Sequence, residues 1–195
     1  MNTTIDFYNQ NADAFISQTL SADMTGLYDP FLSRLCPDGS ILDFGCGSGR
    51  DSKYFIEHGF QVDAIDGSAA LCEKASNLIH QEVRCVSFLD YIPVKKYDGI
   101  WACASLLHSS KPDLEKIFNI LSNSLKPTGL LYASFKYGEF EGIRNGRYFT
   151  DLKEDSLSQI IGSIKNLHLV ETRITDDVRA GRESEKWLNA YIIKS

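Results

Sequence analysis

The sequence predicts an α/β fold with a doubly wound, mostly parallel sheet of seven strands and an antiparallel C-terminal hairpin. Three observations predict it. Strand-like and helix-like segments alternate from residue 40 to residue 135, and a glycine-rich turn directly follows the first buried strand. The last two strand-like segments are separated by a polar stretch too short for a crossover helix, which favours antiparallel pairing. The alternation itself indicates right-handed β-α-β units and thus a Rossmann-like sheet.

Apolar residues at helical spacing predict two leading helices, at 5–17 and 24–35. Pro37-Asp38-Gly39 then predicts a turn that ends the helical pattern. The remaining pattern predicts strands at 40–44, 61–65, 83–86, 99–103, 130–135, 167–174 and 187–193, and helices at 50–58, 69–79, 113–125 and 153–161. A loop is expected from Tyr137 to Tyr148.

Length and composition favour one globular domain over residues 1–195. The net charge of −6, with both signs interspersed, makes duplex nucleic acid an unfavourable partner. Five scattered cysteines without C-x-x-C spacing argue against a disulfide framework and against a zinc site, so we expect no metal. The polar N-terminus and the lack of a long apolar run predict a cytoplasmic protein without a membrane partner. The oligomeric state stays open.

The glycine turn, ILDFGCGSGRD at residues 41–51, could serve two kinds of cofactor. A helix N-terminus after such a turn presents free backbone N–H groups to a ligand. A dinucleotide site favours G-x-G-x-x-G or a final alanine. Here Arg50 stands three residues after Gly47, and the third glycine, Gly49, comes one residue earlier. This departure weakens the nicotinamide interpretation.

The same stretch resembles the first motif of the class I S-adenosylmethionine-dependent methyltransferases. Asp66, in VDAIDGS, follows Gly45 by 21 residues, where that family places an acid for the ribose hydroxyls. A carboxylate suits this task because each oxygen can accept one O–H. SFLDY and YDGIWACASLLH follow in the expected order. The resemblance is closest to small type 11 or type 12 domains, including tellurite-resistance methyltransferases, and runs from about Phe7 to the C-terminus.

The resemblance implies S-adenosyl-L-methionine as cofactor and assigns each motif a part of it. The glycine turn would lie under the methionine part, Asp90 would meet the adenine amino group between Leu89 and Tyr91, and residues 102–105 would lie against the sulfonium. The first helix would cover the cofactor. The cofactor-binding residues expected are Tyr8, Asp43, Gly45, Cys46, Gly47, Gly49, Arg50, Asp51, Asp66, Gly67, Ser68, Leu89, Asp90, Tyr91, Ala102 and Cys103.

Several of these residues also have a structural interpretation. Asp66 before Gly67-Ser68 could be a helix cap or a turn residue. Cys46 and Cys103 could be small buried hydrophobic residues. The chain is expected to divide into cap helices at 1–36, a cofactor-binding half at 37–135 and an acceptor-side half at 136–195.

The catalytic candidates are His108, Lys136, Arg179 and Arg182. His108 follows the fourth strand and could orient an acceptor or take its proton; alternatively it seals the pocket or caps the next helix. Lys136 and the arginines, with Arg144 and Arg147, would suit a carboxylate, a phosphate or an inorganic oxyanion. Arg179 and Arg182 lie among acidic residues, so they could instead only balance charge.

The sequence therefore predicts a methyltransferase acting on a small, possibly anionic acceptor. The alternative is a catalytically inactive S-adenosylmethionine-binding module with an interaction or regulatory role. DNA base methylation is disfavoured, because ACAS stands where an amino-methylating enzyme would carry a Pro-Pro motif and Cys103 lacks a preceding proline. The acceptor and its nucleophilic atom are not defined by these patterns.

Overall fold

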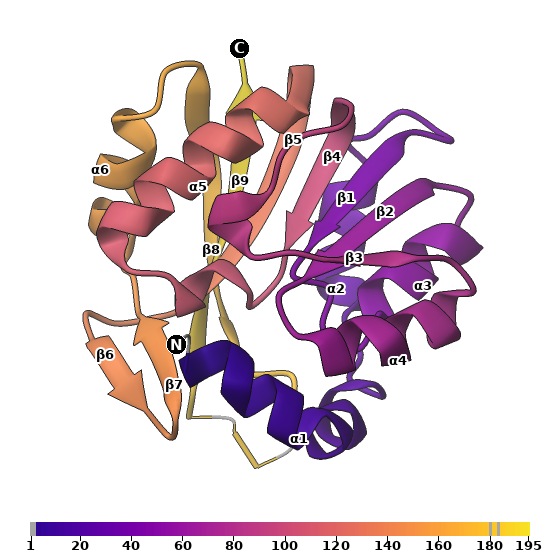
Figure 1. The fold of residues 1–195 in the computed structure, drawn as a ribbon. Helices are drawn as coiled ribbons and strands as arrows, with labels where there is room; N and C mark the ends of the chain where they lie inside the picture. Colours follow the sequence, from indigo (N-terminus) through magenta and orange to yellow (C-terminus); the bar gives the residue numbers. More distant parts are fainter. Residues whose placement is uncertain (1–2, 180, 183) are drawn as a thin grey trace.

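A single seven-stranded sheet organises the molecule. The computed structural model describes residues 3–179, 181–182 and 184–195, and its sheet has the order β3-β2-β1-β4-β5-β9-β8 (Figure 1). The first five strands in this order are parallel, and β9 is antiparallel to both β5 and β8. The strands are β1 Ser40–Phe44, β2 Gln61–Asp66, β3 Val83–Cys85, β4 Tyr97–Ala102, β5 Leu125–Lys136, β8 Leu167–Asp176 and β9 Lys186–Lys194. The predicted fold class is confirmed.

Helices cover both faces of this sheet. The α-helices are α1 Thr3–Thr19, α2 Thr25–Leu32, α3 Arg50–Glu57, α4 Ala69–Ile79, α5 Lys111–Ser124 and α6 Glu154–Gly162. One large core lies between the sheet and helices α5 and α6, and a second lies between the opposite face and helices α2 and α3. Figure 1 shows α5 and α6 in front of the sheet, and α1 near its lower edge beside β7.

The central strands are apolar on both sides because each side is buried. In β1, Leu42 and Phe44 belong to the core under α5, whereas Ile41 belongs to the core under α2 and α3. Leu131 and Leu130 of β5 divide between the two cores in the same way. This explains why the parallel strands appear in the sequence as short continuous apolar runs.

The sequence defines the start of α5 through its cap. The Ser110 hydroxyl accepts a hydrogen bond from the backbone N–H of Asp113 at 3.3 Å, and Pro112 lies in the first turn, where no intrahelical N–H is required. The preceding turn, the 3₁₀ helix η2 Leu106–His108, therefore ends at a fixed point. His108 is thereby placed at the carboxyl end of the sheet.

The expected loop from Tyr137 to Tyr148 is wrong, because this segment contains a β-hairpin. Strand β6, Glu141–Arg144, pairs with β7, Arg147–Thr150, in antiparallel register. Asn145 and Gly146 connect them with φ of 51° and 77°. Two central residues with positive φ are typical of the type I′ turn, for which Asn-Gly is the favoured sequence. The Asn-Gly pair in IRNGRY is therefore the sequence signal for this hairpin.

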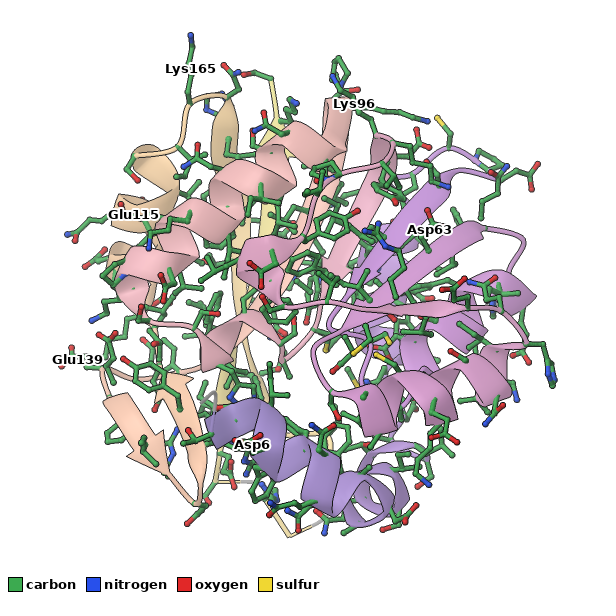
Figure 2. The ribbon with its side chains drawn as sticks, viewed as in Figure 1. Asp6, Asp63, Lys96, Glu115, Glu139 and Lys165 are labelled. Atoms are coloured by element: carbon green, nitrogen blue, oxygen red, sulfur yellow. The ribbon has the colours of Figure 1, made fainter. Side chains whose placement is uncertain are left out.

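Charged side chains lie on the outside of the molecule. Figure 2 shows Lys96, Glu115 and Lys165 projecting away from the layers of the fold, and all three are exposed. No helix in the described part of the chain is long and apolar enough to cross a membrane.

Replacing Phe118 in α5 tests the packing of this helix against the sheet. Its ring is fully buried, so Phe118→Ala should lower the free energy of unfolding by about 3 to 5 kcal/mol through lost burial and a residual cavity. Asn119→Ala, one residue further on the exposed side of the helix, should change it by about 0.5 kcal/mol or less. Equilibrium urea denaturation would measure both. Equal effects for the two variants would contradict the packing described.

Candidate functional site

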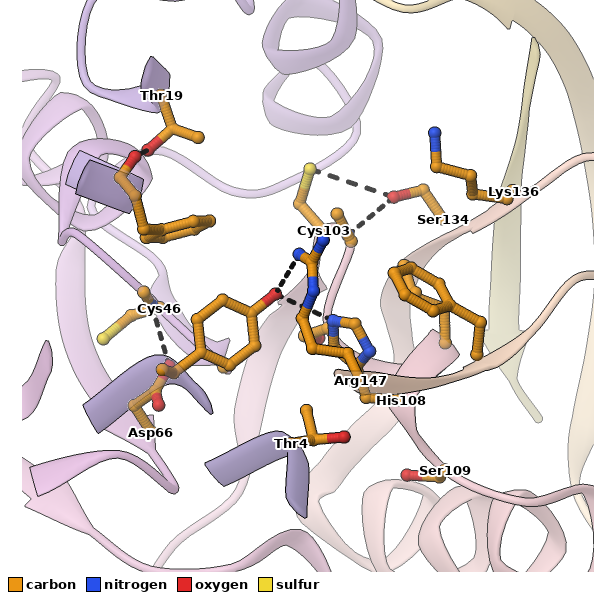
Figure 3. A pocket seen from close by; sticks show the side chains of 18 of the residues that line it. Thr4, Thr19, Cys46, Asp66, Cys103, His108, Ser109, Ser134, Lys136 and Arg147 are labelled. Atoms are coloured by element: carbon orange, nitrogen blue, oxygen red, sulfur yellow. Dashed lines mark hydrogen bonds between the residues drawn. The ribbon is translucent and has the colours of Figure 1, made fainter. Parts of the chain in front are cut away.

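A cavity of about 730 Å³ opens at the carboxyl edge of the sheet. It is lined by the ends of β1, β2, β4 and β5, by α1, by η2 and by the β8–β9 connection (Figure 3). The strand order reverses direction at β1, with β2 on one side and β4 on the other. In open α/β sheets the crevice at such a switch point is the usual ligand site.

The turn after β1 requires glycine at its first position. The backbone N–H groups of Gly45 and Cys46 both donate to the carbonyl of Ile65 at 2.9 Å, and Gly45 has φ +89°. A Cβ on Gly45 would lie 2.4 Å from the Cβ of Ser105. A side chain at position 45 would therefore strain the backbone and displace the chain after β4.

Two further glycines let α1 approach the cavity closely. A Cβ on Gly47 would lie 3.1 Å from the Phe15 ring, and a Cβ on Gly67 would lie 3.1 Å from Ile5. Both apolar side chains come from α1. The first helix therefore covers the glycine turn and the end of β2.

Asp66 ends β2 with its carboxylate at the cavity. One oxygen accepts from the backbone N–H of Gly47 at 2.9 Å, and the other accepts from the N–H of Ser68 at 2.8 Å. Burial raises the pKa of Asp66, and these backbone donors oppose that effect. Each oxygen keeps a further lone pair for a ligand hydroxyl.

A buried acidic pair underlies the glycine turn. The Asp43 carboxylate accepts from the Ser52 hydroxyl at 2.6 Å, and burial, with the neighbouring Asp51, raises the pKa of Asp43. Burial alone would raise the pKa of Asp51 as well. Its contact with Arg50, at 2.5 Å, and hydrogen bonds from Tyr28 and Trp101 outweigh burial and lower it.

His108 has a defined tautomer. Its Nδ1 lies 2.7 Å from the carbonyl oxygen of Tyr148, which can only accept, so Nδ1 carries the proton. The Nε2 atom then accepts from the Tyr8 hydroxyl at 2.9 Å. Removal from water lowers the pKa of His108 to about 4, and nearby Arg147 adds to this effect. His108 is therefore a neutral acceptor that holds the Tyr8 hydroxyl in place.

The end of the cavity away from Asp66 and the glycine turn carries Lys136, at the end of β5 (Figure 3). Its ammonium group forms an ion pair with Glu185 and lies 3.9 Å from Asp177 and 4.7 Å from the centre of the Trp187 ring. Desolvation lowers the pKa of Lys136 to about 8, Asp177 opposes this, and Arg179 and other cations nearby contribute to it. Lys136 remains mostly protonated at neutral pH.

The two arginines of the β8–β9 connection line the cavity and also form ion pairs. Arg179 donates to both carboxylate oxygens of Asp177, at 2.9 and 2.5 Å. Although burial acts in the opposite direction, these contacts lower the pKa of Asp177 to about 2. Arg182 lies 3.5 Å from Glu185. The structure thus shows the charge balance that was the alternative, and an acceptor-binding role for the pair stays a prediction.

In the segment after β3, the aromatic ring that faces the cavity is not the one that the sequence analysis expected. Tyr91, which was expected as a wall of the ligand site, does not line the cavity, because its buried ring packs edge-on against Phe44 at 5.5 Å. Phe88, one helical turn earlier, stacks on Phe44 at 4.6 Å and lines the cavity together with Leu89. Asp90 accepts from the Ser87 hydroxyl at 2.5 Å and lies outside the lining.

Most of the expected site residues reach the cavity. Those that line it are Tyr8, Gly45, Cys46, Gly47, Arg50, Asp51, Asp66, Gly67, Ser68, Leu89, Cys103, His108, Lys136, Arg179 and Arg182. Asp43, Gly49, Asp90, Tyr91 and Ala102 do not line it. Gly49 instead allows α3 to approach α4, since its Cβ would lie 3.1 Å from that of Ala75. Ala102 is buried within β4 opposite Ala133.

Sequence reasoning missed two polar residues of the cavity lining, Ser134 and Asn189. Ser134 of β5 and Asn189 of β9 line the cavity from neighbouring strands. The Ser134 hydroxyl accepts from the backbone N–H of Ala104 at 2.8 Å. Their positions on apolar strands resemble those of core residues, and only the antiparallel register of β5 and β9 brings them together. Among the residues that the structure describes, no group of three or more histidine, cysteine or acidic side chains could hold a metal ion.

The tautomer and the low pKa of His108 predict a pH-dependent stability. Between pH 6.5 and 4 the unfolded state binds more protons than the folded state, so stability falls as the pH falls through this range. The loss should be about 3 kcal/mol. His108→Gln keeps a donor and an acceptor but cannot titrate, and should lack this component. Urea denaturation across the range would measure it, and identical pH profiles would contradict the neutral state of His108.

Comparison with known proteins agrees with this architecture. Residues 41–129 match the family model of a methyltransferase domain. No curated protein matches the sequence. The chain has a TM-score of 0.75 to the Burkholderia thailandensis 1,6-didemethyltoxoflavin-N1-methyltransferase with bound 1,6-didemethyltoxoflavin and S-adenosylhomocysteine, at 18% identity, covering 98% of this chain and 85% of that one.

Two more solved structures are similar. The N-methyltransferase NodS from Bradyrhizobium japonicum, with S-adenosylhomocysteine, has a TM-score of 0.70 at 17% identity, with 94% and 98% of the two chains covered. Magnesium protoporphyrin IX methyltransferase from Synechocystis, with S-adenosylmethionine, has a TM-score of 0.64 at 17% identity, with 96% and 80% covered. Residues 41–129 thus match a methyltransferase domain, and the chain has the fold of the class I S-adenosylmethionine-dependent methyltransferases.

Proposed function

We propose that the protein transfers a methyl group from S-adenosylmethionine to a small anionic acceptor. The observation that carries the proposal is one cavity with two chemically different ends. A carboxylate and a glycine turn form one end, at Asp66 and Gly45–Gly47, and cationic side chains with aromatic walls form the other. The proposal assigns residues 1–36 to the cover, 37–135 to cofactor binding and 136–195 to acceptor binding.

The residues at the first end suit the nucleoside and amino-acid parts of the cofactor. The free lone pairs of Asp66 would accept the ribose hydroxyls, and Phe88 and Leu89 would contact the adenine. The backbone of the turn can approach a ligand closely because Gly45 and Gly47 lack side chains. Arg50, which already donates to the Thr19 carbonyl at 3.0 Å, joins this turn to the end of α1.

The bound cofactor would supply a sulfonium methyl that is already activated toward a nucleophile. The chain then has to exclude water and hold the acceptor in line. Tyr8 and Phe15 of α1 pack edge to face at 5.1 Å over the cavity. His108 fixes the Tyr8 hydroxyl, so we assign it a positioning role, and Lys136 presents a positive charge at the acceptor end.

Small acceptors are also supported by the similar structures. The Burkholderia thailandensis enzyme carries 1,6-didemethyltoxoflavin, a small molecule, in its structure. The cavity volume of about 730 Å³ lies in the range of small-molecule sites. Both ends of the cavity would then be used in one reaction. Turnover to S-adenosylhomocysteine with a panel of small acceptors would distinguish an enzyme from an inactive cofactor-binding module.

Replacing Asp66 tests the placement of the cofactor. Asp66→Ala should weaken S-adenosylhomocysteine binding by about 1.5 to 3 kcal/mol, because charged hydrogen bonds to the ribose are lost. Asp63→Ala removes a carboxylate from the same strand that contacts Lys95 and Tyr97 outside the cavity, and should leave the affinity unchanged. Isothermal titration calorimetry would measure both. Unchanged affinity in folded Asp66→Ala protein would refute the ribose assignment.

A further inference from the structure

Arg147 differs from the other arginines that line the cavity. Four arginines lie in the lining, and three of them have a carboxylate partner within the chain: Arg50 with Asp51, Arg179 with Asp177 and Arg182 with Glu185. Among the described residues, Arg147 forms no such ion pair. Its positive charge is therefore available to a ligand.

The position of this guanidinium group is set by packing. Arg147 begins β7, and its Cζ lies 4.7 Å from the centre of the Phe7 ring and 5.1 Å from that of Phe149. Cation–π contacts of this kind hold a cation without neutralising it. Nη1 donates weakly to the Tyr8 hydroxyl at 3.3 Å. The group is thus oriented before any ligand arrives.

Part of the guanidinium group also lacks a partner. Nε of Arg147 is buried and has no hydrogen-bond acceptor in the described structure. A buried donor on a charged group is costly when it is unsatisfied, and the planar fork of arginine matches the two oxygens of a carboxylate. Figure 3 shows Arg147 beside His108, on the same side of the cavity. The neutral His108 ring neither competes for the anion nor repels the guanidinium.

The neighbouring charges favour a ligand with a single negative charge. Lys136 is the second cation at this end, but it shares its charge with Glu185 and Asp177. A phosphate dianion would bring two charges close to those carboxylates. A carboxylate carries one negative charge, which Arg147 can balance, and the part of the Lys136 charge that Glu185 and Asp177 do not balance adds to the attraction.

The aromatic walls of the cavity, of which Phe149 lies beside Arg147 and Trp187 beside Lys136, favour an apolar, planar body for this ligand. Phe149, Trp187 and Tyr132 all line the cavity. Aromatic side chains contribute large apolar surfaces and bind planar groups by stacking or edge contacts. Such walls would contribute little to binding an inorganic oxyanion.

We propose that Arg147 recognises the carboxylate of a small aromatic or otherwise planar organic acid, and that this acid is the methyl acceptor. The inference rests on the proposed function, because it places the acid beside the cofactor. It deepens that proposal by naming the chemical class of the acceptor and the residue that selects it. Arg147 is then a specificity-determining residue.

Benzoate and its neutral analogue benzamide test the inference by direct binding. Titrated into protein loaded with S-adenosylhomocysteine and followed by calorimetry, benzoate should bind at least about tenfold more tightly than benzamide or inorganic phosphate. Arg147→Met should abolish the preference for benzoate over benzamide. Arg173→Met removes an arginine that contacts Glu171 outside the cavity and should keep it. No preference for benzoate in the wild type, or tighter binding of phosphate, would overturn the inference.

Two further measurements separate the possible failures. Arg147→Lys keeps a cation on a long side chain and should fold. It should reduce the preference for benzoate over benzamide to about threefold or less, because the planar guanidinium fork is lost. A full preference in this variant would refute recognition by the fork. Affinity for S-adenosylhomocysteine should stay within about twofold in both Arg147 variants. If it falls while the benzoate preference persists, Arg147 binds the cofactor carboxylate and the inference is wrong. If the wild type does not bind S-adenosylhomocysteine at all, the proposed function fails, whereas benzoate binding can still be measured without it.

Discussion

The turn between β1 and α3 is the constraint on which the site depends. Two backbone N–H groups of this turn share the carbonyl of Ile65, and a third, from Gly47, reaches the Asp66 carboxylate. These bonds tie the end of β1 to the end of β2. They form only because Gly45 takes a positive φ and has no Cβ that would collide with Ser105. The cavity floor and its acid are thus set by one local geometry.

The buried network under this turn makes the floor rigid. Asp51 accepts hydrogen bonds from Tyr28 of α2 and Trp101 of β4, and it pairs with Arg50. Trp101 stacks on Tyr132 of β5 at 3.9 Å. A single carboxylate therefore connects the first helices, the glycine turn and two central strands. Fully satisfied networks of this kind specify one arrangement of a core, since each unmade bond would be costly.

The end of the cavity that we propose for the acceptor is assembled differently, from segments that are far apart in the chain. Tyr8 of α1, His108 of η2 and Arg147 of β7 meet through side-chain contacts, and the Tyr148 carbonyl fixes the imidazole. The aromatic hairpin β6–β7 brings the guanidinium group to this point. Under the proposed function, a change in the hairpin would alter acceptor binding, whereas the turn that holds Asp66 is formed by other segments.

The sequence by itself determined the sheet, its parallel half and the position of the glycine turn, because these depend on local periodicity and on glycines in order. It also placed Asp66, since a residue directly after a strand must lie at the sheet edge. The tertiary structure alone decided that Phe88 rather than Tyr91 faces the cavity, because one turn of 3₁₀ helix selects which ring points inward. It also decided the surroundings of Arg147: Arg179 pairs with Asp177, two residues earlier in the chain, whereas long-range packing places Arg147 against the Phe7 ring.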